Sequence, residues 1–221
     1  KKADIPNSVK ALGADTFYDC DSLEEVVLGK GLEKVGDETF RYCEKLTKLT
    51  VKGDIESIDS SVFYNTAIKE LQVGKGVSSL KRTLYGQWAL EKIEVEEGNE
   101  SYISEDGVLY NKGKTKLIRY PQSKSDQTEY KVPDGVKTIG EYAFNRNKTI
   151  TKVELPDSVQ TINAYAFCNC ENLEEIKLSE GLETIGNYVF AYCNGIKKAD
   201  IPNSVKALGA DTFYDCDSLE E

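Results

Sequence analysis

The sequence lacks histidine and methionine altogether and has a single tryptophan among its 221 residues. Without histidine, it has no Ser-His-Asp or Cys-His nucleophilic site and no metal site that depends on an imidazole ligand. It also lacks the G-x-G-x-x-G and P-loop motifs that cradle nucleotide phosphates. Its carboxylates recur with the repeat described below, which favours a solvated face over a catalytic pair. We therefore expect no enzymatic activity and no cofactor.

Positive charge is scarce, since 28 Lys and Arg stand against 38 Asp and Glu, giving a net charge of −10. That balance argues against nucleic acid as a partner and against an anionic membrane surface. Long hydrophobic runs are also missing, and none approaches the roughly 20 residues that a membrane-spanning helix needs. We therefore expect no membrane insertion.

What the sequence does have is a period of 22 or 23 residues. Phenylalanine marks this period, at Phe17, Phe40, Phe63, Phe144, Phe167, Phe190 and Phe213. A fixed period of this length predicts a solenoid whose coils bury their apolar faces only by stacking on one another. We expect about nine coils in a single solenoid over residues 1–221, because a solenoid core can extend to any length.

Each period repeats the same local signals. An alternating apolar run, as in residues 23–28 or 173–178, predicts a short strand with one buried face, and stacked strands would form a parallel sheet. A turn rich in Pro, Gly, Asn or Asp follows. We interpret the stretch around each Phe, such as residues 13–18, as one or two helical turns. The expected fold class is α/β, with a parallel β-sheet on one face and short helical turns on the other.

One step of 37 residues, from Val95 to Val132, interrupts the period. Residues 102–120 within it contain two strand-like runs around a turn at 111–114, which predicts a β-hairpin insertion. The coil just before this insertion lacks the usual Phe and Cys. We expect Trp88 to repair the packing there.

Residues 1–25 and 197–221 are identical, at an offset of 196. Neighbouring coils agree only at their pattern positions, so identity over a whole coil is a separate phenomenon. It fits either natural tandem copies of about eight coils or an engineered closed period, and in both cases we expect the chain to be a piece of something longer. The identical ends are also compatible with head-to-tail self-association.

Five of the six cysteines occupy one column of the repeat, namely Cys20, Cys43, Cys170, Cys193 and Cys216. Periodic placement favours a ladder of buried thiols that pack as small apolar residues. Stacked coils bring thiols near disulfide range, but parallel side chains make a good dihedral angle unfavourable. Cys168 lies off the ladder, and we expect it to be partly exposed. Cys168 and Cys170 do not form a C-x-x-C pair, so we assign no metal site.

The motif I-P-x-S-V-x-x-[LI]-G-x-x-x-F-x-x-C-x-x-L begins at Ile5 and again at Leu155, where Leu replaces the first Ile. It resembles the BspA-like leucine-rich repeats of bacterial surface proteins, as does the pair D-G-V-L-Y and L-I-R-Y-P in residues 106–121. The two coils that contain Asn65 and Asn147 depart from the motif, because they lack its cysteine, whose place Thr66 and Asn147 take. The resemblance implies a leucine-rich-repeat solenoid from a cell-surface or secreted bacterial protein. Several members of that family look like adhesins.

A repeat solenoid offers its strand face as an extended binding surface. The outward positions of that face carry mixed charges and no aromatic stripe. These candidate partner-binding residues are Val27, Thr50, Gln72, Glu94, Glu154, Lys177 and Asp200. We expect a non-enzymatic extracellular module for adhesion or binding, which recognises a protein or glycan through weak contacts multiplied along many copies. A structural spacer, an engineered self-stacking scaffold and an accessory domain of a larger secreted enzyme remain alternatives.

Overall fold

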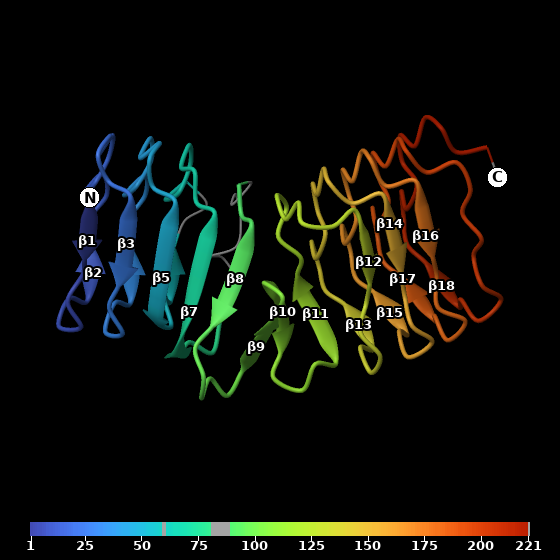
Figure 1. The fold of residues 1–221 in the computed structure, drawn as a ribbon, viewed down its shortest axis with the longest axis horizontal. Helices are drawn as coiled ribbons and strands as arrows, with labels where there is room; N and C mark the ends of the chain where they lie inside the picture. Colours follow the sequence, from blue (N-terminus) through green and yellow to red (C-terminus); the bar gives the residue numbers. More distant parts are fainter. Residues whose placement is uncertain (59–60, 81–88, 221) are drawn as a thin grey trace. The chain divides into compact units, whose positions relative to one another are not determined.

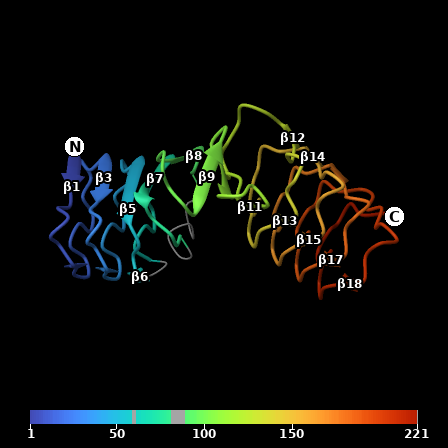
Figure 2. The same cartoon turned by 90° about the horizontal axis from the view of Figure 1, so that it is seen from below.

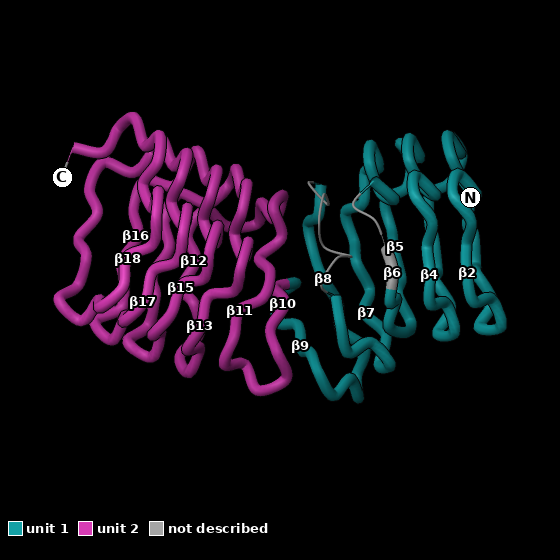
Figure 3. Tube along the Cα trace, turned by 180° about the vertical axis from the view of Figure 1, so that it is seen from behind, with its two compact units in different colours: residues 1–107 teal, residues 108–221 magenta. Residues whose placement is uncertain are grey.

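The computed structural model describes residues 1–58, 61–80 and 89–220. Its Cα trace divides into two compact units, which are residues 1–107 and 108–221 (Figure 3). Each unit is a β-solenoid in which successive coils add strands to parallel sheets, with about eight turns in all. The prediction of a leucine-rich-repeat solenoid with parallel sheets is confirmed, whereas the count of nine coils is not. The described residues include no helix long and apolar enough to cross a bilayer.

Unit 1 contains two parallel sheets (Figure 1). The larger has the order β1-β3-β5-β7-β8, with β1 at Lys2–Asp4, β3 at Glu25–Leu28, β5 at Lys48–Gly53, β7 at Glu70–Gly76 and β8 at Lys92–Val95. The smaller has the order β2-β4-β6, with β2 at Ala11–Leu12, β4 at Lys34–Val35 and β6 at Ser57–Ile58. Strand β9 at Tyr102–Glu105 follows β8. The inward residues Val26, Leu49, Leu71 and Ile93 lie opposite one another in this register and are buried.

Unit 2 repeats the arrangement, and its coils follow one another in Figure 2. One sheet has the order β12-β14-β16, with β12 at Glu129–Lys131, β14 at Lys152–Glu154 and β16 at Glu175–Lys177. The other runs β18-β17-β15-β13-β11-β10, with β10 at Val108–Asn111, β11 at Lys116–Arg119, β13 at Thr138–Ile139, β15 at Thr161–Ile162, β17 at Thr184–Ile185 and β18 at Ala207–Leu208. Buried Ile139, Ile162 and Ile185 occupy equivalent register positions in β13, β15 and β17.

The predicted hairpin is present as the antiparallel pair β10 and β11. Its turn is closed by the amide of Lys114, which donates to the carbonyl of Asn111 at 2.9 Å. The side-chain oxygen of Asn111 also accepts from the amide of Lys116 at 2.8 Å. Strand β11 then pairs in parallel with β13, so the hairpin supplies a strand to the sheet of unit 2.

Stacked phenylalanine rings form the centre of each unit. Ring centroids are 5.2 Å apart for Phe17 and Phe40 and 5.5 Å apart for Phe40 and Phe63. The corresponding distances from Phe144 through Phe213 are 4.7, 5.4 and 5.3 Å. Tyr120, whose ring lies 5.0 Å from that of Phe144, extends the second stack into the hairpin coil. The role expected of Trp88 falls outside the described residues.

The expected helical turns are not confirmed, because the described residues contain strands and turns but no helix. Each Phe-bearing segment carries two residues with positive φ, four positions apart, such as Asp15 at 57° and Asp19 at 55°. A left-handed residue cannot continue a right-handed helix, so each segment is limited to single turns. Tyr142, Tyr165 and Tyr188 occupy the first of these positions in unit 2, and their rings stack at 5.0 and 5.1 Å.

In the cysteine column, Cys43, Cys170 and Cys193 are buried and Cys20 and Cys216 are half-buried, and all six thiols of the chain are free. The thiols of Cys43, Cys170 and Cys193 each donate to the phenylalanine carbonyl of the preceding coil at 3.0–3.1 Å. Asn147 fills the same column by donating to the carbonyl of Pro121 and accepting from two backbone amides. The expectation that Cys168 is exposed is wrong, since it is buried and its sulfur accepts from the amide of Asn169 at 3.1 Å.

The duplicated segment adopts two different local structures. In the first copy, β1 pairs in parallel with β3, and Ile5 is buried. In the second copy, the equivalent residues 198–200 form no strand, and Ile201 is exposed. The same three residues therefore form a strand beside β3 but not beside β16, although residues 11–12 and 207–208 form strands in both copies.

Candidate functional site

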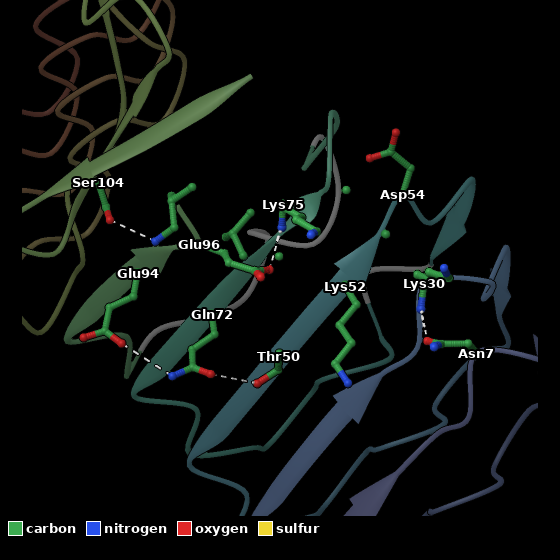
Figure 4. Close-up of a pocket in the computed structure, with 15 residues that line it drawn as sticks. Asn7, Lys30, Thr50, Lys52, Asp54, Gln72, Lys75, Glu94, Glu96 and Ser104 are labelled. Carbon is green, nitrogen blue, oxygen red and sulfur yellow. Dashed lines mark hydrogen bonds between the residues drawn. The ribbon is translucent and has the colours of Figure 1, made fainter. Parts of the chain in front are cut away.

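A hollow of about 940 Å³ lies on the strand face of unit 1 (Figure 4). It is lined by residues of β5, β7 and β8, by the turns that follow these strands, and by Ser104 of β9. Side chains alternate along each strand, so Thr50 and Lys52 of β5 both point away from the apolar core while Val51 between them is buried. The lining also includes Val73, which is almost fully buried, half-buried Val95, and the glycines at the ends of β5 and β7.

A row of polar side chains crosses this hollow from coil to coil. The hydroxyl of Thr50 donates to the side-chain oxygen of Gln72 at 3.2 Å, and the amide of Gln72 donates to a carboxylate oxygen of Glu94 at 3.4 Å (Figure 4). Glu94 also accepts from the ammonium group of Lys92 at 3.2 Å, and Glu70 lies 3.4 Å from the same ammonium. Hydrogen bonds to Glu94 and Glu70 raise the pKa of Lys92. The row is therefore fixed by its own contacts.

The carboxylates around the hollow are engaged by donors of the same chain. Burial raises the pKa of Asp54, but hydrogen bonds from the side chain and amide of Ser78 and the amide of Ser79 outweigh it and lower that pKa overall. Glu96 accepts from the amide of Lys75 at 2.8 Å. Each negative charge at this site thus has a structural partner.

Three lysines lie on successive coils at the same edge of the hollow, and we call Lys30, Lys52 and Lys75 the lysine column (Figure 4). All three are exposed, and none forms an ion pair with any residue that the structure describes. The sequence analysis did not single them out. Their signal was a lysine within two residues of the last inward Leu or Val of β3, β5 and β7, where unit 2 carries Asp134, Asp157 or Glu180.

The seven candidate residues on the strand face have different surroundings. Thr50, Gln72 and Glu94 line the hollow of unit 1 together. Val27 lies in the same row of the sheet but is only 4% exposed. In unit 2, Lys177 of β16 forms an ion pair with Glu154 of β14 at 3.1 Å. That pair lowers the pKa of Glu154.

Asp200 lies outside any strand and pairs with Lys198 at 3.2 Å. A second hollow, of about 570 Å³, opens beside it between β16 and residues 197–203. The described residues hold no group of three or more Cys, Asp or Glu placed to bind a metal ion. Of the two hollows, the one in unit 1 combines a fixed polar row with lysines that lack ion-pair partners.

Comparison with known proteins identifies a family. The model of the BspA type leucine rich repeat region matches residues 1–112 and 120–221 in six copies. The solved structure of the pneumococcal vaccine antigen PcpA is 32% identical with a TM-score of 0.80, covering 99% of this chain and 60% of that one. A leucine rich cell surface protein from Faecalibacterium prausnitzii is 26% identical with a TM-score of 0.65, covering 99% of this chain and 71% of that one. No curated protein matches.

Proposed function

The chain belongs to the BspA type leucine rich repeat family, and we propose that it is a non-enzymatic protein-binding module of a bacterial surface protein. Two of the similar solved structures are a pneumococcal vaccine antigen and a leucine rich cell surface protein, which supports a location at the cell surface or in the secreted fraction. The chain spans 60% of the length of the PcpA chain.

The strand-face hollow of unit 1 is the proposed binding surface. The observation that carries this assignment is the hydrogen-bonded row from Thr50 through Gln72 to Glu94, which holds polar side chains in place across three coils. Side chains that are already ordered lose less conformational entropy when a partner binds. In unit 2, the outward positions that correspond to Thr50 and Gln72 carry Glu154 and Lys177, which form an ion pair with each other at 3.1 Å.

A binding array of immobilised host matrix proteins and glycans tests this proposal. We expect the chain to bind at least one protein, and we expect Thr50→Tyr with Gln72→Tyr to abolish that binding by filling the hollow. Lys177→Tyr, which changes the same face of unit 2, is the matched control and should bind normally. Binding that survives the unit 1 substitutions, or is lost equally in the control, would contradict the proposal.

A structural role through self-association is a second candidate, favoured by the identical segments 1–25 and 197–221. Leu208 in the second of these segments is 55% exposed, on a strand that β17 pairs on one side. Unpaired strand edges are templates for pairing with another chain. Sedimentation velocity at increasing protein concentration measures this association directly, and a monomer at every concentration would reject it.

A further inference from the structure

We propose that the lysine column of unit 1 binds an acidic segment of a partner protein that lies extended across the coils. This inference rests on the proposed function, because it specifies the chemistry of the partner that the hollow receives. It concerns Lys30, Lys52 and Lys75, which the polar row does not include.

The charge balance of the hollow carries the first step. Three carboxylates line it, but Asp54 accepts from Ser78 and Ser79, Glu94 accepts from Gln72 and Lys92, and Glu96 accepts from a backbone amide. The three ammonium groups of the lysine column have no such ion-pair partner in the described part of the chain. The three lysines and three carboxylates of the lining balance in formal charge, but the carboxylate oxygens are already engaged, so the ammonium groups are the charged groups left to bind a partner.

The spacing of the lysines carries the second step. The turn after β3 holds Lys30, while Lys52 and Lys75 lie on the neighbouring strands β5 and β7. Neighbouring strands are about 4.8 Å apart, so the column spans roughly 10 Å. An extended peptide places alternate side chains on one face about 6.7 Å apart. Two or three acidic residues at alternate positions therefore match the column within the reach of flexible lysine stems.

The shape and lining of the hollow favour a peptide over a sugar. Its volume of about 940 Å³ has room for several residues. The described lining includes no aromatic ring, so a pyranose would find no flat apolar face on which to stack. The half-buried side chain of Val95 and the glycines beside it instead suit the aliphatic side chains that alternate with acidic ones in an extended segment.

The lysines are not a requirement of the coil. At the position of Lys30 and Lys75, unit 2 carries exposed Asp134, Asp157 and Glu180, and at that of Lys52 it carries Pro133, Pro156 and Ser179, yet it still forms its parallel sheets. The coils therefore do not need lysine at these positions in order to stack. Its substitution should leave the fold intact.

Fluorescence anisotropy with short labelled peptides tests the inference on the full chain. The probe alternates aspartate with valine, and its control replaces each aspartate with asparagine. We expect the acidic peptide to bind at low salt and to weaken strongly at high salt, because exposed ion pairs are screened. Lys30→Gln with Lys52→Gln and Lys75→Gln should reduce affinity about tenfold or more, as three exposed pairs are lost.

A matched variant makes the same change in net charge at three exposed lysines away from the hollow, through Lys34→Gln, Lys45→Gln and Lys137→Gln. It should bind like the unaltered chain. Equal weakening in both variants, or no binding of the acidic peptide, would overturn the inference. Heparin supplies a sulfated glycan for comparison. If the lysine column is needed for heparin while the peptide does not bind, the occupant is an anionic glycan and the peptide assignment is wrong.

The two proposals fail separately. If a protein found on the array still binds the triple lysine variant but not the Thr50→Tyr with Gln72→Tyr variant, the hollow is a binding surface and the lysine column is not its acidic subsite. If neither set of substitutions affects the array, both proposals fail.

Discussion

Replacing Phe167 with alanine removes one ring from the middle of the stack in unit 2. The side chain of Phe167 is fully buried, and its ring lies 4.7 Å from that of Phe144 and 5.4 Å from that of Phe190. Deleting a buried phenylalanine side chain costs about 3–5 kcal/mol. Because two aromatic contacts of about 0.5–1.5 kcal/mol each are lost with it, we expect a value in the upper half of that range.

Equilibrium unfolding in urea, followed by circular dichroism, measures this cost. For a chain of this size, a loss of about 4 kcal/mol lowers the urea midpoint by roughly 1–2 M. The matched control is Phe213→Ala, because Phe213 is only half-buried and stacks on one ring, that of Phe190 at 5.3 Å. Its expected cost is about half as large. A Phe167→Ala cost below about 1 kcal/mol, or a larger cost for Phe213→Ala, would refute the stacking argument.

Three further predictions concern pH, backbone contact and thiol reactivity. The hydrogen bonds that lower the pKa of Asp54 stabilise the folded state above the ordinary aspartate pKa, and this contribution is lost as pH falls through the lowered pKa. Asp54→Asn should flatten that part of an acid-unfolding curve, and an unchanged curve would reject the effect. Gly53→Ala should lower the melting temperature, since a Cβ there would lie 2.6 Å from the carbonyl oxygen of Lys30, whereas Gly113→Ala, with its nearest atom at 4.0 Å, should not. A hydrogen bond with the thiol of Cys170 and burial raise the pKa of Cys193, so iodoacetamide should label Cys193 only after unfolding. Labelling of Cys193 in the native chain, detected by mass spectrometry, would count against the buried ladder.

The core could be predicted from the sequence because one physical requirement recurs in every coil. Phe40, Phe167 and Phe190 are fully buried, as the 23-residue period requires of coils that shelter one another. The hairpin was also predictable, because the turn around Asn111 and Gly113 lies between two strand-like runs.

Local backbone geometry could not be predicted in the same way. The segments around each Phe are helical in composition, yet Tyr142 and Tyr165 adopt positive φ, which tyrosine rarely does, and Asp15 adopts it at the same position of its coil. The duplicated segment makes the same point, since Lys2–Asp4 form a strand and the identical residues 198–200 do not. The backbone conformation of these segments depends on contacts with neighbouring coils, which the local sequence does not specify.

The candidate site was predicted only in part. Alternation along the strands identified Thr50, Gln72 and Glu94 as outward residues, but it also placed Val27 outward, where the structure buries it. The lysine column was missed because the sequence shows where charges recur and not which of them are already paired. The hydrogen bonds to Asp54 and to Glu96 had to be located before the lysines could be identified as the charged groups left to bind a partner.

Hydrogen exchange of backbone amides tests the central claim, that neighbouring coils protect one another. The amides of Phe144, Phe167 and Phe190 each donate to a carbonyl of the next coil, at 2.7, 2.9 and 2.8 Å. The account predicts that all three exchange slowly and at similar rates, through opening of several coils together. Fast exchange at Phe167 while Phe144 and Phe190 remain protected would show that a single coil opens alone, and would contradict it.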